Sequence, residues 1–318
     1  MENVRRKISI VGAGAVGTSI AYAALIRGVA REVALMDVNR AKVHAEVLDL
    51  SHGLEFVPRA GVTGSDDPAV CADSDVILFT AGAKQKPGQS RLELAEATVD
   101  LTRRALPPIV EAAPDAIIVM VTNPVDVVTY AALKVTGLPR NRLFGSGTVL
   151  DTSRLRFSLS QRCGVAVQNV HAYIAGEHGD SEVPLWSSAT IGGVPLLDWE
   201  PPAGGAPLDA AAREEIYREV VGAAYAIIQG KGATNYAIGL AAARIAEAIL
   251  ADEHRVLPVS SLISDDFHGI SDVCLSLPTM VDAAGAGRFL PVSMSADELT
   301  ALRESARTLK EMQRSFGL

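Results

Sequence analysis

The sequence predicts an α/β protein, with a doubly wound parallel sheet in the first half of the chain and a mixed α/β domain in the second. Three observations lead to this prediction. Short apolar runs alternate with helical segments up to residue 150, a glycine-rich turn follows the first apolar run, and beyond residue 150 helices mix with short strands. Such alternation is typical of an open parallel sheet with helices on both faces. We therefore expect domains at residues 1–150 and 151–318.

The first strand and helix enclose a turn suited to phosphate binding. Ile8-Ser-Ile-Val11 is a short apolar run with β-branched residues, and Thr18–Ile26 is an alanine-rich helix that ends near Gly28. Between them stands Gly12-Ala-Gly14-Ala-Val-Gly17. In a strand-to-helix turn, such glycines let the backbone approach a pyrophosphate, whose charge faces the helix N-terminus. The alternative is a glycine turn with an unrelated acidic cap.

A second strand, Val33–Met36, ends at Asp37, at a distance from Gly17 that suits binding of the adenosine ribose. A carboxylate there would accept hydrogen bonds from the ribose hydroxyls and repel a 2′-phosphate. The sequence therefore favours NAD over NADP, although Arg40 lies nearby.

The remaining first-half elements continue the alternation. Asp75–Ala81 and Ala116–Val121 are predicted strands, and Arg91–Ala112 is a predicted helical stretch interrupted by Pro107-Pro108. Ligands of open parallel sheets bind beyond the carboxyl ends of the strands. Segments of this chain that follow predicted strands are 81–91, 122–126 and 145–151.

The last helix is predicted from its start and its spacing. Ser295-Ala-Asp-Glu298 matches a capping box. Apolar residues then recur at helical spacing, which predicts docking on the core: Leu299, Leu302, Ala306, Leu309, Met312 and Phe316.

Bulk properties agree with a soluble enzyme, and the cysteine pattern agrees with the cytoplasm. A net charge of −8 and a pI near 5.3 argue against a nucleic-acid partner. We expect no signal peptide, because the apolar run after the basic segment Met1–Lys7 is too short. We expect no membrane span, because no apolar run approaches the roughly 18 residues that a span requires. Three widely spaced cysteines are typical of reduced packing residues, and we expect no metal site.

A single histidine stands in the polar segment Gly176-Glu-His-Gly-Asp180, directly after the apolar stretch Val170–Ala175. A redox cofactor beside a group that titrates near neutrality suggests coupled hydride and proton transfer between an alcohol and a ketone. Taken alone, His178 could equally be a salt-bridged loop residue.

These motifs together resemble the lactate/malate dehydrogenase family, and within it the bacterial lactate-specific members. The resemblance runs nearly end to end and implies a Rossmann domain followed by a mixed α/β substrate domain. It rests on the glycine turn and on Lys86–Arg91, Thr122–Asp126, Leu150–Arg154, Ile174–Asp180 and Lys231–Asn235.

The resemblance implies a role for each matching side chain. His178 would be the acid in ketone reduction and the base in alcohol oxidation. Asp151 would hydrogen-bond the other ring nitrogen, and Arg154, one helical turn later, would bind the substrate carboxylate. Arg91 would reach the ketone oxygen from a closing loop. The plain alternatives are a surface pair of Asp151 with Arg154 and a solvated charge at Arg91.

Binding positions follow from the same resemblance. Asn123 would bond the carbonyl or the nicotinamide side, while Thr234 and Ile238 would line the pocket and the nicotinamide face. The positions implied for NAD are Gly12, Gly14, Val16, Gly17, Asp37, Lys42, Gly82, Ala83, Asn123, Ser146 and Ile238.

Substrate choice depends on Gln85. Malate dehydrogenases carry an arginine at the matching loop position, which pairs with the second carboxylate of oxaloacetate. A neutral amide leaves that carboxylate without a cation, so pyruvate and L-lactate are favoured. Lys84 and Lys86 flank Gln85 and keep malate dehydrogenase, or a 2-hydroxyacid dehydrogenase of relaxed specificity, as an alternative. A non-catalytic NAD-binding protein is the alternative from another class.

Arg156 and His171 suggest regulation. Bacterial lactate dehydrogenases that fructose 1,6-bisphosphate activates carry an arginine and a histidine at the matching positions, where they bind its phosphates across a subunit interface. The resemblance also implies a homotetramer. The alternative is an unremarkable arginine and a packed histidine.

Overall fold

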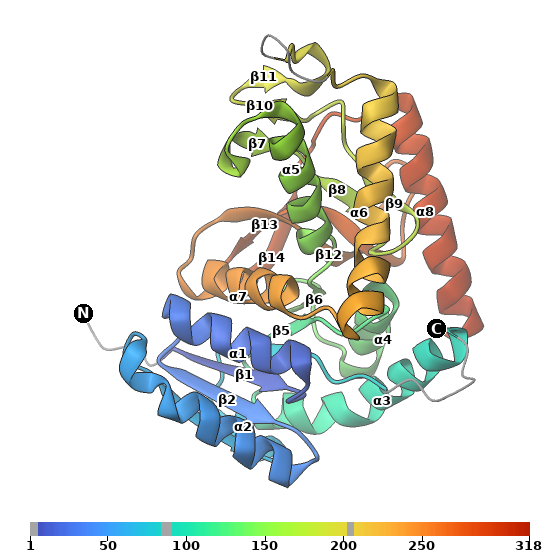
Figure 1. Ribbon diagram of the computed structural model, residues 1–318. Coiled ribbons are helices and arrows are strands. Elements are labelled where there is room, and N and C mark those ends of the chain that lie inside the picture. The colour runs from blue at the N-terminus through green and yellow to red at the C-terminus, as the bar shows by residue number, and fades with distance from the viewer. Residues whose placement is uncertain (1–5, 84–90, 202–206) are drawn as a thin grey trace.

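The computed structural model describes residues 6–83, 91–201 and 207–318 (Figure 1). The helices are α1 (Ala15–Arg27), α2 (Arg40–His52), α3 (Arg91–Ala112), α4 (Val125–Thr136), α5 (Val149–Cys163), α6 (Ala210–Lys231), α7 (Tyr236–Leu250) and α8 (Ala296–Ser315). The strands are β1 (Lys7–Val11), β2 (Glu32–Met36), β3 (Gly61–Ser65), β4 (Val76–Phe79), β5 (Ile117–Met120), β6 (Leu143–Gly145), β7 (Val170–His171), β8 (Ile174–Gly176), β9 (Glu182–Pro184), β10 (Thr190–Ile191), β11 (Val194–Pro195), β12 (Arg255–Ile263), β13 (Val273–Asp282) and β14 (Gly285–Phe289).

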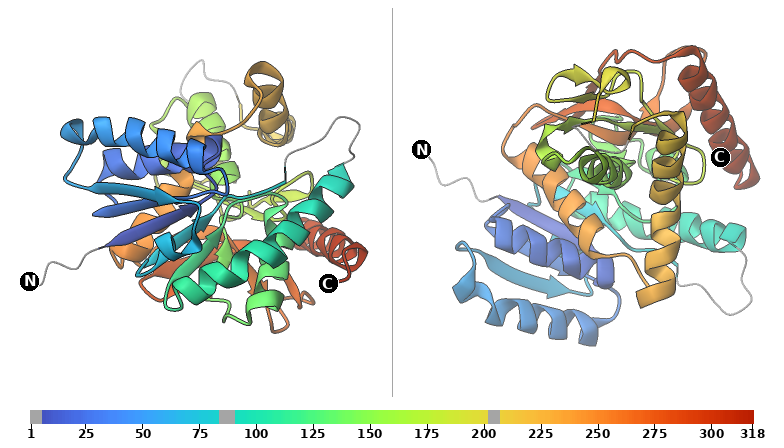
Figure 2. Two further views of the ribbon diagram at one scale, coloured as in Figure 1. Left: turned by 90° about the horizontal axis from the view of Figure 1, so that it is seen from below. Right: turned by 45° about the horizontal axis from the view of Figure 1, so that its top comes forward.

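The first half of the chain forms the doubly wound parallel sheet that the sequence predicts. Its strands run in the order β3-β2-β1-β4-β5-β6, and every neighbouring pair is parallel. The chain builds outward from β1 to β3 and then returns to the other side of β1 with β4. Figure 2 shows helices on both faces of these strands. The strands are buried because helices cover both faces, as the near-continuous apolar sequences of β1 and β4 require.

The same sheet continues into the second half, which the sequence did not indicate. The long antiparallel pair of β12 and β13 joins β6 through Ser260 opposite Gly145, and β8 and β9 extend the sheet further. Helix α7 also lies on α1 of the first half (Figure 1), where a Cβ at Gly239 would stand 2.9 Å from the Ser19 backbone. The boundary near residue 150 stays a prediction, and a separate sheet β11-β10-β7 lies beyond it.

Helix α3 corrects one expectation. The sequence predicts an interruption at Pro107-Pro108, but the helix runs through both prolines. Proline removes one backbone hydrogen bond and frees the carbonyl four residues earlier. Both proline rings are exposed. The freed carbonyls belong to Arg103, which is half-buried, and to Arg104, which is exposed. Water can therefore replace the lost bonds, and the helix continues.

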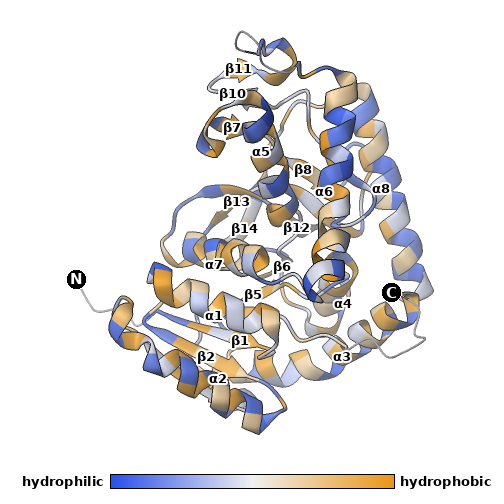
Figure 3. Ribbon diagram, in the orientation of Figure 1, coloured by the Kyte–Doolittle hydropathy of each residue, from blue (hydrophilic) through white to orange (hydrophobic). Residues whose placement is uncertain are grey.

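The last helix forms as predicted. Ser295 and Glu298 make the reciprocal capping box at the start of α8. Leu302 and Leu309 are fully buried in a core cluster shared with the parallel sheet. In Figure 3, hydrophilic and hydrophobic stretches alternate along α8, as an amphipathic docking helix requires. Among the described helices, none is both long and apolar enough to cross a bilayer.

Replacing Leu302 with alanine tests the docking of α8. Leu302 is 0% exposed, so the Leu302→Ala variant leaves a cavity and should lower the free energy of unfolding by about 2–5 kcal/mol. Urea denaturation measures the change. The matched control is Leu197→Ala, because Leu197 is 54% exposed and should give a far smaller loss. Equal losses in the two variants would contradict the docking of α8 as a source of stability.

Candidate active site

Residues implied for cofactor binding collect at one edge of the parallel sheet. Gly12 follows β1, Asp37 follows β2, Gly82 follows β4, Asn123 follows β5 and Ser146 follows β6. The carboxyl ends of the parallel strands lie at a single edge. The strand order reverses between β1 and β4, because β2 and β3 lie on one side of β1 and β4 lies on the other. Such a switch point is where open α/β sheets bind their ligands.

The glycine turn leaves room for a phosphate at one position and packs tightly at two others. A Cβ at Gly17 would lie 1.9 Å from the Gly12 carbonyl oxygen, and one at Gly12, where φ is +104°, would lie 2.7 Å from Thr80 Oγ1. Around Gly14, by contrast, nothing stands within 4 Å of the ideal Cβ position. No side chain caps the N-terminus of α1, whose first-turn N–H groups can therefore bind an anion.

Asp37 is held beside this turn. Its Oδ2 accepts a hydrogen bond from the Ala13 backbone at 2.8 Å, and its Oδ1 accepts one from the Asn39 backbone at 3.0 Å. The half-buried carboxylate keeps lone pairs for ribose hydroxyls. Lys42 lies in the first turn of α2, where its backbone N–H donates to the Asn39 side chain. The residues present therefore fit a dinucleotide.

The cluster around His178 is formed by two segments that lie far apart in the sequence. His178 Nδ1 stands 2.5 Å from Asp151 Oδ2, and Asp151 is 2% exposed. The His178 side chain is 22% exposed, so its ring is lined by protein but remains open on one side. Within the described segments, His178 Nε2 has no hydrogen-bond partner and is free to meet a substrate.

Arg154 completes this cluster. Its Nη1 donates to Asp151 Oδ1 at 2.7 Å, and its side chain is 16% exposed. The alternative of a surface pair is therefore wrong, because both side chains lie inside the protein. One end of the guanidinium is occupied by Asp151, and its remaining N–H groups have no partner within 6–83, 91–201 and 207–318. They can bind a planar carboxylate.

Local packing brings α5 and the histidine loop together. Thr148 Oγ1 donates to the Ile174 carbonyl at 2.6 Å, and the Ile174 backbone N–H donates to Thr152 Oγ1 at 2.9 Å. Ile174 opens β8, and His178 follows that strand directly. Two hydroxyls of α5 and its N-cap thus fix the strand that presents the histidine.

Asp126 is a site residue that sequence reasoning missed. Its Oδ2 accepts from the His178 backbone N–H at 2.8 Å, and its Oδ1 accepts from Ser260 Oγ at 2.6 Å. Burial raises the pKa of Asp126 to about 6, and the Ser260 bond opposes that rise. The sequence feature that could have identified Asp126 is its place in segment 122–126, which follows a predicted strand, three residues after Asn123. The bond ties the Asn123 segment to the histidine loop.

Charges inside the cluster shift its pKa values strongly. Burial opposes charging of the His178 ring, but the Asp151 carboxylate outweighs it and raises the pKa of His178 to about 9. Burial favours a higher pKa for Asp151, yet His178 and Arg154 hold that pKa below its usual value. An ion pair of imidazolium and carboxylate therefore dominates at neutral pH.

Comparison with known proteins identifies the family. Models of the lactate/malate dehydrogenase NAD-binding domain and α/β C-terminal domain match residues 6–145 and 148–315. The chain is 58% identical over 311 residues to an L-lactate dehydrogenase of Bifidobacterium animalis subsp. lactis (strain AD011), covering 98% of this chain and 97% of the relative. The chain belongs to the lactate/malate dehydrogenase family. Its cofactor is NAD, and it is an oxidoreductase.

Two solved structures of this family share the whole fold. A lactate dehydrogenase from a Medee basin deep-sea metagenome library superposes with a TM-score of 0.94 at 36% identity, covering 99% of both chains. The minor L-lactate dehydrogenase of Enterococcus mundtii, in a ligand-bound form, gives a TM-score of 0.92 at 38% identity, covering 98% of both chains. The Rossmann and α/β domains expected from the resemblance are confirmed.

Other site residues of this dehydrogenase are placed less completely. Thr234 lies half-buried in the loop between α6 and α7, and Ile238 lies in the first turn of α7 against the core. The Ala83 N–H donates to Thr98 Oγ1 at 3.3 Å, and Val16 lies in the first turn of α1. Gln85, with Lys84 and Lys86, lies outside the described residues. The backbone of Arg91 begins α3, but its side chain lies outside the described set.

Arg156 lies on the other side of α5 from Arg154 and contacts the segment that follows His171. The Arg156 Nε donates to the carbonyl of Ala172 at 2.9 Å, and its guanidinium lies 5.0 Å from the centroid of the Tyr173 ring. His171 precedes Ala172 on β7 and is exposed. The alternative of a packed histidine is wrong, whereas a regulatory role stays a prediction.

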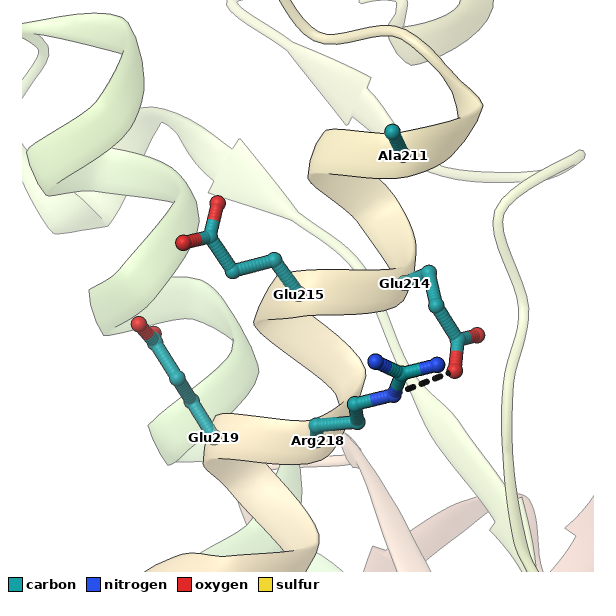
Figure 4. Close-up of a pocket in the computed structure, with 5 residues that line it drawn as sticks. All are labelled: Ala211, Glu214, Glu215, Arg218 and Glu219. Carbon is teal, nitrogen blue, oxygen red and sulfur yellow. Dashed lines mark hydrogen bonds and ion pairs between the residues drawn. The ribbon is translucent and has the colours of Figure 1, made fainter.

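A hollow on α6 does not belong to the active site. Figure 4 shows its lining of Glu214, Glu215, Glu219, Ala211 and Arg218, with Arg218 paired to Glu214. Its excess of carboxylates would repel a keto acid or a dinucleotide, both of which are anions.

Two glycine variants test the cofactor turn. In Gly14→Ala the new methyl occupies open space, so the thermal unfolding midpoint should stay within about 2 °C while the Kd for NADH rises at least tenfold. In Gly17→Ala the methyl meets the Gly12 carbonyl, so both stability and NADH binding should fall. Calorimetry and NADH fluorescence measure the two quantities. Unchanged NADH affinity in Gly14→Ala would place the pyrophosphate elsewhere.

Proposed function

We propose that this chain is an NAD-dependent L-lactate dehydrogenase that interconverts pyruvate, NADH and a proton with L-lactate and NAD⁺. The observation that carries the proposal is the buried cluster of His178, Asp151 and Arg154, tied through Asp126 to the cofactor edge of the sheet. A non-catalytic NAD-binding protein would have no use for a half-buried imidazolium with a free ring nitrogen. The relative at 58% identity bears the same name.

His178 performs the proton transfer. When bound, NADH supplies the hydride to the carbonyl carbon of pyruvate. The His178 Nε2–H then donates its proton to the carbonyl oxygen, and in the reverse direction the neutral ring takes the hydroxyl proton of lactate. The bond to Asp151 holds the ring so that Nε2, rather than Nδ1, faces the reacting oxygen.

The remaining residues bind and orient the substrate. The free N–H groups of Arg154 pair with the substrate carboxylate, and Asn123 at the end of β5 bonds the carbonyl or nicotinamide side. Arg91, whose backbone begins α3, would place a cation on the ketone oxygen. Thr234 and Ile238 line the pocket and the nicotinamide face.

The two reaction directions should depend on pH in opposite ways. The pKa of His178 is raised from 6.5 to about 9, so the proton donor for pyruvate reduction is present below pH 9 and lost above it. Reduction should therefore fall, and lactate oxidation rise, as the pH passes through about 9. Profiles of kcat/KM in both directions measure this.

The His178→Asn variant should bind NADH normally but lose at least about a thousandfold in turnover. Near-normal turnover would overturn the mechanism.

Pyruvate and L-lactate are proposed as the substrates because Gln85 is neutral. The Gln85→Arg variant should raise the ratio of kcat/KM for oxaloacetate to that for pyruvate by roughly a hundredfold or more, through a charge-assisted pair with the distal carboxylate. The matched control is Lys84→Arg, which changes a neighbouring side chain and adds no charge. A wild-type enzyme that prefers oxaloacetate would favour the malate dehydrogenase alternative instead.

Regulation by fructose 1,6-bisphosphate is proposed from Arg156 and His171. The two residues come from neighbouring segments, and His171 is exposed and free to meet a phosphate. In a homotetramer, facing cations of two subunits repel, and a bisphosphate between them would favour the assembled state in proportion to its tighter binding there.

The cytoplasm is the proposed compartment, since all three cysteines are free and buried.

An effector titration tests this proposal. Fructose 1,6-bisphosphate should lower the KM for pyruvate and increase the tetramer fraction. The His171→Gln variant should reduce the response while keeping basal turnover, because His171 stands outside the catalytic cluster. Steady-state kinetics and sedimentation measure both effects. No change at millimolar effector would leave an unregulated enzyme.

A further inference from the structure

Glu182 is a buried acid that the proposed reaction does not use. It begins β9, pairs with Gly176 of β8 and is only 4% exposed. Its backbone carbonyl accepts a hydrogen bond from Tyr217 Oη at 3.1 Å. Its side-chain Oε1 is buried and has no hydrogen-bond partner among the residues described. A buried acid without partners destabilises a fold unless it is neutral or faces an opposite charge.

The opposite charge is the His178 ring. One carboxyl oxygen of Glu182, one of Asp151 and a ring nitrogen of His178 all lie within 4.8 Å of one another. No hydrogen bond joins Glu182 to the ring, so any influence between the two groups acts through charge. At this separation the charge of one group changes the protonation equilibrium of the other.

Several elements bring charged or titratable groups to this pair. Those that face Glu182 or His178 are Asp126 of α4, Asp151 and Arg154 of α5, Glu177 of the loop after β8, and Tyr217 of α6. Burial, aided by Asp151, raises the pKa of Glu182 to about 9, the same range as that of His178. The two groups therefore lose their protons over one range of pH.

We propose that Glu182 is a positioning residue for proton transfer, neutral while the enzyme works at neutral pH and anionic in alkaline medium, where its charge keeps His178 protonated. The inference rests on the proposed role of His178. An anionic Glu182 extends upward the pH range in which the ring can donate its proton. A neutral Glu182 avoids adding a third carboxylate beside Asp151 and the incoming substrate anion.

The Glu182→Gln variant tests the proposal in the full-length NADH complex. The readout is the nitrogen NMR shift of the His178 ring as a function of pH, assigned by its loss in His178→Asn. Without the anion, the midpoint of the ring titration should fall by about one pH unit or more. The alkaline limb of pyruvate reduction should move in the same direction, with kcat near neutral pH little changed.

Matched variants separate this effect from general ones. Asp180→Asn removes the same charge from an exposed position of the same loop and should move the midpoint by less than about 0.3 pH units. Glu182→Asp keeps a carboxyl group, so the midpoint of its ring titration should lie between those of the wild type and Glu182→Gln. Glu182→Met is a second neutral variant with an unbranched side chain, and it must reproduce the shift even if the Gln variant folds poorly.

Two results would overturn the proposal: a wild-type midpoint in both neutral variants, or an equal shift in Asp180→Asn. Full turnover in His178→Asn would instead remove the proposed function on which the inference rests. The two failures are therefore distinguishable, because the ring titration does not require turnover.

Discussion

The hydrogen bond between Asp151 and His178 joins residues 27 positions apart, and the geometry of the site depends on it. Asp151 is almost fully buried, so its ionised form needs partners inside the protein. His178 supplies one and Arg154 the other. The same bond fixes the orientation of the ring and raises its pKa, so that one carboxylate both positions the acid and keeps it charged. Removing that carboxylate would leave Arg154 without its ion-pair partner and would lower the pKa of the His178 ring.

Charge balance limits what else the site can hold. Asp126, Asp151 and Glu182 lie around a single histidine, and burial raises the pKa of two of these three acids. Only Asp151 has both cations as direct partners, and it is the one whose pKa falls. A substrate that brings one carboxylate to Arg154 fits this balance. A second carboxylate would require another cation in this cluster.

Continuity of the sheet brings cofactor and acid together. The parallel strands end beside the glycine turn, and β12 extends the same sheet toward β8, after which His178 follows. Ser260 of β12 links the halves directly, because it faces Gly145 in the register and donates to Asp126. This link joins the histidine loop, through Asp126, to the edge of the sheet where the parallel strands end.

The sequence by itself determined the features that depend on local spacing. The glycine turn, the acid after the second strand, the capping box of α8 and the pairing of Asp151 with His178 were all predictable, the last through family resemblance. Only the tertiary structure decided which side chains are buried and which distant residues meet. Glu182 has no local motif, Asp126 is indistinguishable in sequence from an ordinary helix-start acid, and Pro107-Pro108 is tolerated because its face is exposed. Burial and long-range proximity set pKa values, and neither is encoded in the spacing of neighbouring residues.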